Sequence, residues 1–489
     1  MRRFPMRSRL GRLAVAVAVL TPSVAVASTV AGVPGVASAA CTLCAGGEFH
    51  PIAPVRIFDT RPTSSANPEL PINDVQPYGA KPINLGSATT GVQRFDVQLL
   101  GIGDRTFENP WLPSWVAPTD VLAVLASVIV VRPGTRGNLA TWPAGTVRLT
   151  SSSLVNFASG QTTSNLSVVR PGTGGALTVE MRGAAVSTAH VVIDVFGWYS
   201  TSSYLGEDRV ESTDERGGRT VPITPGRILD TGAGAVGPAS TTELTIRGAS
   251  TIGTSPRLVV PDSQAVTAVM LNVAVSLPTE NTYVSVVPEM PLSGVPATSN
   301  ANVAAGTVRS AMVIVPIAAD GRIRLYNNAG YTRLVGDVLG YVETRLDELR
   351  AGRVVPLSTP FRAFDTRLTQ FGKVPLGPGQ SEEWSFAAFA ASVTVASVSV
   401  GNQVGFFGTL TNASLTRQYP TVPVRSNLRL SPSTGVSTVP VSSHINTAED
   451  VAVANMTVGL YGTSSRIWVY NAAGYAHYLL DVSAVILAD

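Results

Sequence analysis

The sequence predicts an all-β chain of three tandem β-sandwich modules, jelly-roll-like in type, after an N-terminal signal peptide. Gly (45) and Pro (34) are abundant among its 489 residues, and charged residues make up only 14%, a composition typical of short strands joined by many turns. Apolar residues recur with a period of two along several segments. One set of landmark residues also occurs three times in the same order, which predicts three copies of one unit.

The first 40 residues have the order of segments found in export signals. Five arginines lie among the first twelve residues, followed by the apolar run Leu13 to Leu20 and the small residues Ala37 to Ala40. We therefore expect a signal peptide over 1–40 and a secreted mature protein. A retained membrane anchor is the alternative, although Pro22 and Pro34 interrupt the apolar segment. No later segment has eighteen consecutive apolar residues, so we expect no membrane span in the mature chain.

Charge argues against a nucleic-acid partner. Residues 1–40 hold five arginines and no acidic residue, so their removal changes the formal net charge from +3 to −2, since 3 − 5 = −2. The basicity of the whole chain therefore belongs to the expected signal peptide. No basic run remains in the mature chain, and we expect no binding to nucleic acid.

Both cysteines, Cys41 and Cys44, lie in a predicted linker over 41–47. Outside the cytoplasm they could form a local disulfide, although so short a loop constrains the unfolded chain little. A metal site with His50 is one alternative, but a structural zinc usually needs four ligands. Lipidation of Cys41 is another, although Ser38 stands where a large aliphatic residue is usual. We expect no metal and no cofactor.

Three landmarks define the repeat. Each copy opens with Pro-x-Arg-x-(aliphatic or aromatic)-Asp-Thr and closes with an aspartate inside an apolar run, and an asparagine precedes that aspartate by 35 to 38 residues. The openings are Pro54 to Thr60, Pro225 to Thr231 and Pro360 to Thr366; the asparagines are Asn156, Asn302 and Asn446; the closing aspartates are Asp194, Asp337 and Asp481. The copies predict modules over 48–200, 219–343 and 354–489.

Strands are predicted from the period of two within a module. Val269, Leu271, Val273 and Val275 fall on one face of an extended chain, and the apolar residues of Arg322 to Tyr326 alternate with polar ones. We expect these to be half-buried strands. Several such strands in each copy, with turn residues between them, predict a sandwich or jelly-roll-like module.

The recurring arginines and aspartates are the candidate site residues. They are Arg56, Asp59 and Asp194, then Arg227, Asp230 and Asp337, then Arg362, Asp365 and Asp481. We expect them to serve the scaffold, because a guanidinium can bind a carboxylate through two charge-assisted hydrogen bonds. A catalytic role is the alternative, but no nucleophile, base or metal set accompanies any copy in the sequence, so we expect no enzyme. Calcium binding by the closing aspartates is a further alternative, although no Asp-x-Asp-x-Asp-Gly loop is present.

A Pro-rich insertion in the first module carries Trp111 and Trp115. Two tryptophans in a loop make it a candidate ligand loop, since flat aromatic rings stack on sugars, and burial in the core is the alternative for the pair. We expect Trp142 and Trp198, by contrast, to be buried in the core.

These residues resemble a repeat module of secreted actinobacterial proteins, which opens with Pro-x-Arg-x-Leu-Asp-Thr-Arg and closes near Val-Asp-Val-x-Gly-Tyr. The best matches are Val269 to Val275, Tyr326-Asn327 and Asp337 to Tyr341. Gly232 in place of the second arginine, and the lack of a Gly-Tyr pair after Asp481, are departures. The resemblance covers almost the whole expected mature chain. Such modules often lie beside cell-wall amidase or glycosidase domains, which implies association with the envelope or with polysaccharide.

We therefore expect a secreted, non-enzymatic cell-envelope protein that binds or adheres to cell-wall or surface polysaccharide through β-sandwich repeats. A structural surface-layer or filament component, formed by self-association, is one alternative. A secreted glycan hydrolase that uses Asp59, Asp230 or Asp365 is the other.

Overall fold

The computed structural model describes most of the chain beyond residue 44. The described residues are 45–62, 83–85, 93–100, 116, 118–148, 152–184, 187–201, 204, 216–345, 347, 349–372, 374–395, 398–399, 401–413, 425–435, 439–447 and 452–489. They belong to one compact unit, Cys41–Asp489. The expected signal peptide over 1–40 lies outside the described residues.

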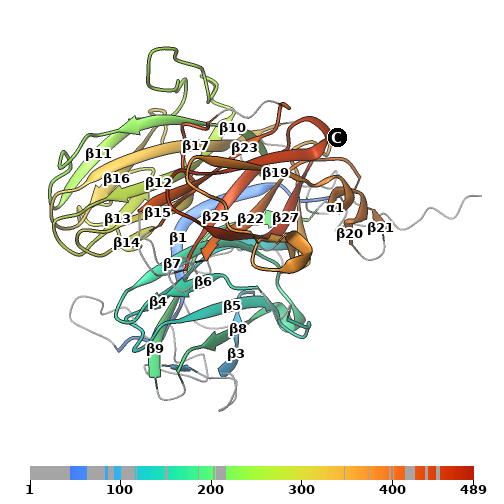
Figure 1. Ribbon diagram of the computed structural model, residues 1–489, viewed down its shortest axis with the longest axis horizontal. Coiled ribbons are helices and arrows are strands. Elements are labelled where there is room, and N and C mark those ends of the chain that lie inside the picture. The colour runs from blue at the N-terminus through green and yellow to red at the C-terminus, as the bar shows by residue number, and fades with distance from the viewer. Residues whose placement is uncertain are drawn as a thin grey trace, which may run out of the picture. The chain divides into compact units, whose positions relative to one another are not determined.

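In the described part of the chain, each of the three modules has two antiparallel layers of four main strands, and Figure 1 labels most of these strands. The strands of module 1 are β1 (Phe49–Asp59), β3 (Gln93–Gln98), β4 (Val121–Val131), β5 (Gly137–Pro143), β6 (Val155–Phe157), β7 (Thr163–Val169), β8 (Ala176–Arg182) and β9 (Ser187–Ser200). Those of module 2 are β10 (Gly218–Asp230), β11 (Ser240–Thr245), β12 (Val266–Ser276), β13 (Thr282–Val287), β14 (Ala301–Val303), β15 (Val308–Pro316), β16 (Arg322–Asn327) and β17 (Arg333–Thr344). Those of module 3 are β18 (Val354–Asp365), β19 (Gln380–Ser385), β22 (Gln403–Ala413), β23 (Ser426–Pro432), β24 (Ile445–Thr447), β25 (Val453–Leu460), β26 (Arg466–Asn471) and β27 (His477–Leu487).

The strand order is the same in every module. One sheet, which we call the inner sheet, runs β1-β9-β4-β7 in module 1, β10-β17-β12-β15 in module 2 and β18-β27-β22-β25 in module 3. The pairing of β1 with β10 joins the inner sheets of modules 1 and 2 into one nine-stranded sheet, in which the short strand β2 (Ile83–Leu85) pairs with β9. The other, the outer sheet, runs β3-β8-β5-β6, β11-β16-β13-β14 and β19-β26-β23-β24. Two facing sheets of four antiparallel strands in this order form a jelly roll. The prediction of an all-β chain with three tandem jelly-roll-like modules is confirmed.

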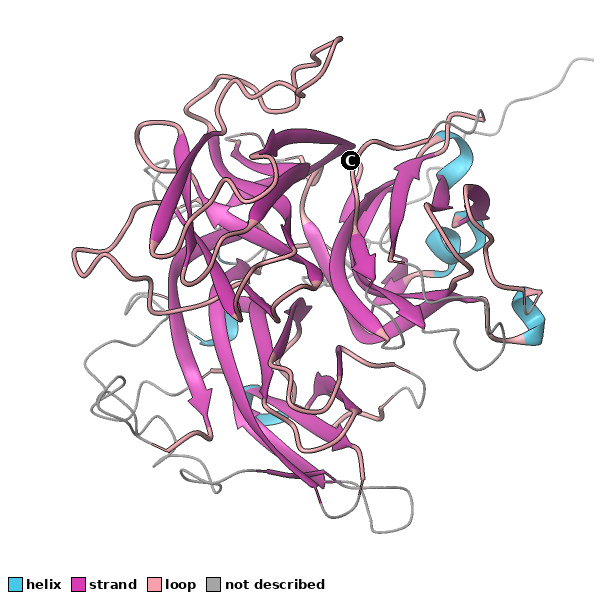
Figure 2. Ribbon diagram, turned by 60° about the vertical axis from the view of Figure 1, so that its left-hand side comes forward, coloured by secondary structure: helices cyan, strands magenta, loops and turns pink. Residues whose placement is uncertain are grey.

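Few other elements occur among the described residues (Figure 2). They are the short strands β2 (Ile83–Leu85), β20 (Thr394–Val395) and β21 (Val398–Ser399), the helix α1 (Ala387–Ser392), and the 3₁₀ turns η3 (Pro118–Asp120), η4 (Thr173–Gly175), η6 (Thr369–Phe371) and η7 (Thr463–Ser465). None of the described helices has the length and apolarity needed to cross a membrane.

Strand β12 is buried on both faces, so the expectation of a half-buried strand is wrong here. Val269, Leu271, Val273 and Val275 belong to the core of module 2, as their period of two predicts. Met270 on the opposite face is also fully buried, in a different cluster. The second face is covered because the inner sheets of the three modules pack against each other.

A shared apolar core joins the modules. Twenty buried residues from the strands of the inner sheets form this cluster: Phe49, Leu122, Ala123, Leu125, Leu166, Val168, Phe196 and Tyr199 from module 1, Ala268, Met270, Met312, Ile314, Leu339 and Val342 from module 2, and Val354, Phe407, Met456, Val458, Ala484 and Ile486 from module 3. Separate clusters fill the space between the two sheets of each module. Each inner sheet therefore packs on one side against its own outer sheet and on the other against its sister modules.

The first strands of the modules, together with the residues just before them, contact one another and close a ring of backbone contacts. The contacts are Phe49 with Gly218, Thr220 with Gly352, and Val354 with Gly47. At the last of these, the two residues exchange two hydrogen bonds of 2.9 Å. A Cβ at Gly47 would lie 2.1 Å from the carbonyl oxygen of Ser200, so only glycine allows this approach.

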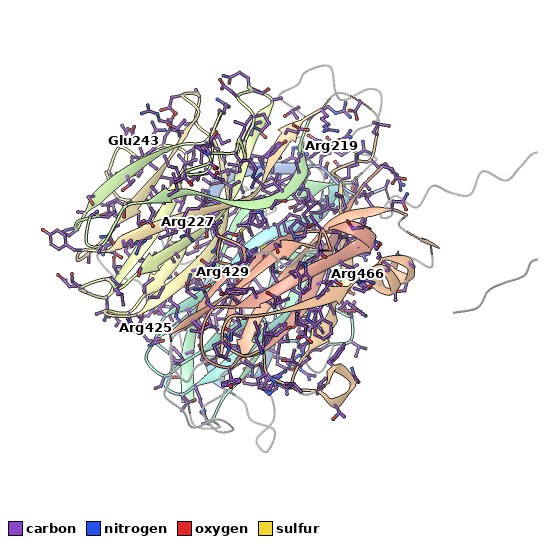
Figure 3. The ribbon with its side chains drawn as sticks, turned by 45° about the horizontal axis from the view of Figure 1, so that its top comes forward. Arg219, Arg227, Glu243, Arg425, Arg429 and Arg466 are labelled. Atoms are coloured by element: carbon purple, nitrogen blue, oxygen red, sulfur yellow. The ribbon has the colours of Figure 1, made fainter. Side chains whose placement is uncertain are left out.

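A buried ion cluster lies beside this ring. Glu48, Arg219 and Arg353 each follow the ring glycine of their module, and they therefore occupy corresponding positions. Oε1 of Glu48 accepts hydrogen bonds from Nε of Arg219 at 3.1 Å and from Nη2 of Arg353 at 3.4 Å. Arg219, labelled in Figure 3, also donates to Asp347 at 2.9 Å. Glu48 and Arg219 are fully buried, so each charge depends on its partners for stabilisation.

We predict that Glu48→Gln lowers the free energy of unfolding by about 3–5 kcal/mol, because it removes the buried negative charge around which Arg216, Arg219 and Arg353 gather, although Arg219 keeps its pair with Asp347. Urea unfolding followed by circular dichroism measures the change. Glu243→Gln is the control, since Glu243 pairs with Arg322 at a side chain that is 51% exposed, and it should cost about 1 kcal/mol or less. Equal losses in both variants would contradict the prediction.

Candidate functional site

The first arginine of each repeat binds the closing aspartate of the same module through two hydrogen bonds. In module 1, Nε and Nη2 of Arg56 lie 2.8 and 3.2 Å from the two carboxylate oxygens of Asp194. Arg227 and Asp337 give 2.9 and 3.2 Å, and Arg362 and Asp481 give 2.5 and 3.1 Å. The structure thus brings together residues that lie 110 to 138 positions apart in the chain.

Prolines at the start of each module help to set this geometry. The register between the first and last strands shifts between Pro51 and Val55, between Pro222 and Gly226, and between Pro356 and Phe361. Proline has no backbone N–H, so a bulge here avoids an unmade ladder bond. Directly after each bulge the arginine lies opposite its aspartate in the paired strands.

The aspartate of the opening motif binds a second arginine. Asp59 accepts hydrogen bonds of 3.0 and 2.7 Å from Nε and Nη2 of Arg61, and Asp365 accepts 2.8 and 2.7 Å from the same atoms of Arg367. Module 2 has Gly232 at that place, and the guanidinium comes from another strand. Arg333 binds Asp230 at 2.7 and 2.5 Å.

The source of Arg333 explains a departure from the repeat. Arg333 occupies the position that His190 and His477 hold in the other modules, four residues before the closing aspartate. There, the histidine Nδ1 lies 3.2 Å from Thr60 Oγ1 in module 1 and 3.1 Å from Thr366 Oγ1 in module 3. Module 2 therefore keeps the charge pair but draws its arginine from the closing strand.

The threonine of the motif also bonds to the closing strand. Its hydroxyl accepts a hydrogen bond of 2.9 to 3.0 Å from a backbone amide, and its own amide donates back at 3.0 to 3.1 Å. The pairs are Thr60 with Val191, Thr231 with Leu334, and Thr366 with Tyr478. Arg, Asp and Thr of the motif therefore all act at the junction between the first and the last strand of a module.

Burial and ion pairing act in opposite directions on these carboxylates. Burial raises the pKa of Asp194 and of Asp481, and their arginines oppose that shift. Burial also acts to raise the pKa of Asp365, but hydrogen bonds and charge from Arg367 outweigh it and lower the pKa. The hydrogen bonds from Arg333 lower the pKa of the more exposed Asp230.

The other candidate residues are not placed by the structure. Trp111, Trp115, Cys41 and Cys44 lie outside the described residues. His50, the third member of the metal site considered with the cysteines, stacks on Trp198 with ring centroids 4.0 Å apart. Burial lowers the pKa of His50 to about 3. Within the described ranges, no three His, Cys, Asp or Glu side chains gather as a metal ion would require.

An arginine-rich cluster on the outer sheet of module 1 is not apparent from the sequence repeats. Glu180, fully buried, binds Arg94 from β3 and Arg182 from β8, each at 2.6 Å, and also Arg148 from the loop after β5. The guanidinium carbons of Arg94 and Arg148 lie 5.9 and 5.7 Å from the ring centre of Trp142. We call these five residues the Glu180 cluster.

Trp142 is buried, as expected, but not within the core of its module. It lies opposite Thr178 in the β5–β8 ladder, on the face turned away from the core residues Leu177 and Val179. Arginine side chains cover its ring instead. Trp198, in contrast, is part of the module 1 core.

No known protein family matches the sequence, and no curated protein matches it either. Among solved structures, "The Triple Jelly Roll Fold and Turret Assembly in an Archaeal Virus" matches at 11% identity over 90% of each chain, with a TM-score of 0.17. A structure of Sulfolobus Turreted Icosahedral Virus matches at 10% identity over 90% of this chain and 92% of the other, also with a TM-score of 0.17.

A third match is the M60 catalytic domain with the CBM51-1 and CBM51-2 domains of Clostridium perfringens ZmpB. It is 8% identical over 72% of this chain and 43% of the other, with a TM-score of 0.14. TM-scores this low do not establish common architecture, so the jelly-roll assignment rests on the strand order alone.

If the recurring charges serve the scaffold, Asp194→Asn should lower the free energy of unfolding by about 2–3 kcal/mol, since it weakens a buried bidentate pair. Asp230→Asn is the matched control. Its side chain is 22% exposed and that of its partner Arg333 is 41% exposed, so the loss should stay below about 1 kcal/mol. Chemical denaturation of the purified variants decides this, and an Asp194→Asn protein as stable as the wild type would refute the scaffold role.

The lowered pKa of Asp365 predicts a pH dependence. A carboxylate whose pKa is lower in the folded than in the unfolded state contributes stability at neutral pH, and loses it as the pH falls below the ordinary value of about 3.9 and through the lowered pKa. The stability difference between wild type and Asp365→Asn should therefore be constant from pH 7 to 5 and shrink below about pH 4. Urea midpoints at a series of pH values measure it; a difference that grows towards acid pH would show the opposite sign.

Proposed function

We propose that this is a secreted, non-enzymatic protein of the cell envelope that binds surface polysaccharide through the outer sheets of its three jelly rolls. The inner sheets are buried against one another in the shared core, and the recurring arginines and aspartates form ion pairs with each other. The outer sheets are therefore the extended faces that remain for a ligand.

The observation that carries this proposal is the side-chain chemistry of these outer sheets. In module 3 the guanidinium of Arg429 lies 5.2 Å from the ring centre of Tyr470, and both side chains are half-buried. In module 2 the half-buried Tyr283 lies on the outer sheet, 6.3 Å from the ring of the buried Tyr326. The Glu180 cluster takes the corresponding place in module 1. Aromatic rings offer apolar faces to sugar rings, and guanidinium groups donate several hydrogen bonds to hydroxyls and acids.

The shared core supports a role in multivalent contact. Three jelly rolls in one compact unit carry three outer sheets on a single chain. Weak contacts at each sheet then combine, because the second and third are made at high effective concentration. A repetitive polymer such as a polysaccharide is the class of ligand that benefits from such an arrangement.

We predict that the purified protein binds insoluble cell walls and polysaccharides in a glycan panel, and that Tyr470→Ala weakens binding about threefold or more by removing one aromatic face. Tyr331→Ala is the control, because Tyr331 is 56% exposed but lies in the loop between β16 and β17 and not on an outer-sheet strand, and it should bind as the wild type does. Pull-down and surface plasmon resonance measure both.

Two outcomes would overturn the proposal. Self-assembly into filaments or layers without binding to any glycan would favour the structural surface component. Release of soluble sugar from the panel, lost in Asp59→Asn, Asp230→Asn or Asp365→Asn variants that still fold, would favour a glycan hydrolase.

A further inference from the structure

The edge strands of the three inner sheets, β7, β15 and β25, lie against one another. Asparagine side chains join two of the three pairs. Oδ1 of Asn165 in β7 accepts a hydrogen bond of 2.7 Å from the backbone amide of Met456 in β25. Oδ1 of Asn455 in β25 accepts one of 3.0 Å from the backbone amide of Met312 in β15. Both asparagines are buried, so each of these bonds links two modules away from solvent.

The third pair, β15 with β7, lacks such a side chain. Asn165 and Asn455 each lie nine residues after the landmark asparagine of their module, and the residue at that position in module 2 is Ala311. The backbone amide of Leu166 in β7 corresponds to the two methionine amides, and it donates to Oδ1 of its own neighbour Asn165 at 3.0 Å. One amide group of a threefold pattern is therefore missing between modules 1 and 2.

Asn455 shows which groups the missing amide would contact. Its Nδ2 donates to the carbonyl oxygen of His444 at 2.7 Å and to Oδ1 of Asn272 at 2.8 Å. Asn300 corresponds to His444, since each lies two residues before the landmark asparagine of its module. Ser127 corresponds to Asn272, since each lies opposite the closing aspartate of its module in the strand ladder. Both Asn300 and Ser127 have oxygen atoms that can accept a hydrogen bond.

A cavity lies beside Ala311, among these corresponding groups. Ala311, Leu166, Asn300 and Ser127 are all part of its lining, so the cavity brings together residues of modules 1 and 2. Its volume is about 10 Å³. A cavity of about 10–15 Å³ with two to four polar partners is sufficient for one water molecule. The cavity therefore has the size and the polar lining that a single buried water requires.

We propose that this cavity is a binding site for one water molecule, which takes the place of the side-chain amide that Ala311 lacks. The water accepts a hydrogen bond from the amide of Leu166 and donates to the carbonyl oxygen of Asn300 and to Oγ of Ser127. Ser164 donates to the same carbonyl at 3.1 Å, and a carbonyl oxygen has a second lone pair for the water. The Leu166 amide is shared between the water and Asn165, as in other three-centre hydrogen bonds.

Crystal structures of the full protein and of two variants, at a resolution that shows ordered water, test this site. In the wild type we expect one water within about 3.2 Å of Leu166 N, Asn300 O and Ser127 Oγ. In Ala311→Asn the side-chain amide should displace this water and make the same bonds, with a thermal midpoint no lower than that of the wild type. Ala311→Val is the matched control, because it fills the cavity without a polar group. Its midpoint should fall by roughly 1–3 °C, since buried polar groups lose a partner.

Three results would overturn the proposal. The first is a wild-type map that shows other buried waters but none in this cavity. The second is a water that contacts fewer than two of the three named atoms. The third is an Ala311→Asn protein that is less stable than Ala311→Val, because a site that uses a water as an amide should accept an amide. If neither variant folds, the wild-type map decides alone, and none of these results depends on whether the protein binds polysaccharide.

Discussion

One buried carboxylate stands where the three modules meet. Glu48 directly precedes the first strand of module 1, and the two arginines that donate to it, Arg219 and Arg353, come from the corresponding positions of modules 2 and 3. The Nε of Arg216 lies 3.8 Å from its other carboxylate oxygen. An isolated buried charge would be unstable, so the buried carboxylate of Glu48 depends on the arginines of modules 2 and 3 for its stabilisation. The ring of backbone contacts and the shared core depend on the same approach of the first strands. The three modules, which follow one another in the sequence, are therefore joined in one compact unit.

The repeat motif acts at a different junction, inside each module. Arg, Asp and Thr of the opening all bind the closing strand, so the first and last strands of the jelly roll are tied together by side chains as well as by the sheet ladder. Module 2 shows that the charge pair itself, and not the position of its arginine, is what the fold retains. Gly232 cannot supply the guanidinium, and Arg333 supplies it from the neighbouring strand. In the sequence of module 2 the opening motif lacks its second arginine, but in the structure the aspartate of that motif still pairs with an arginine.

Much of the fold could be predicted from the sequence, because the repeat and the period of two are local patterns. The burial of the second face of β12 could not, since Met270 differs from a solvent-facing residue only through contacts with other modules. Glu48, Arg219 and Arg353 were hidden for a related reason. They occupy the same position in the repeat but differ in residue type. The sequence does not show that their opposite charges pair, because the pairing needs contact between the modules. The residues of the Glu180 cluster come from β3, β8 and a loop, so no regular spacing along the sequence predicts that they lie together.

Triplication lets the modules diverge where the scaffold does not constrain them. Substitutions on an inner sheet disturb either the module core or the shared core, and substitutions in the motif disturb the closing strand. The solvent face of an outer sheet is under neither constraint. The outer sheets accordingly carry different ion pairs: Arg322 with Glu243 and Arg324 with Asp320 in module 2, Arg466 with Glu383 in module 3, and three arginines around Glu180 in module 1. Under the proposed function, one stable body with three different outer faces would suit contact with a chemically mixed polymer, because each face could bind a different part of it.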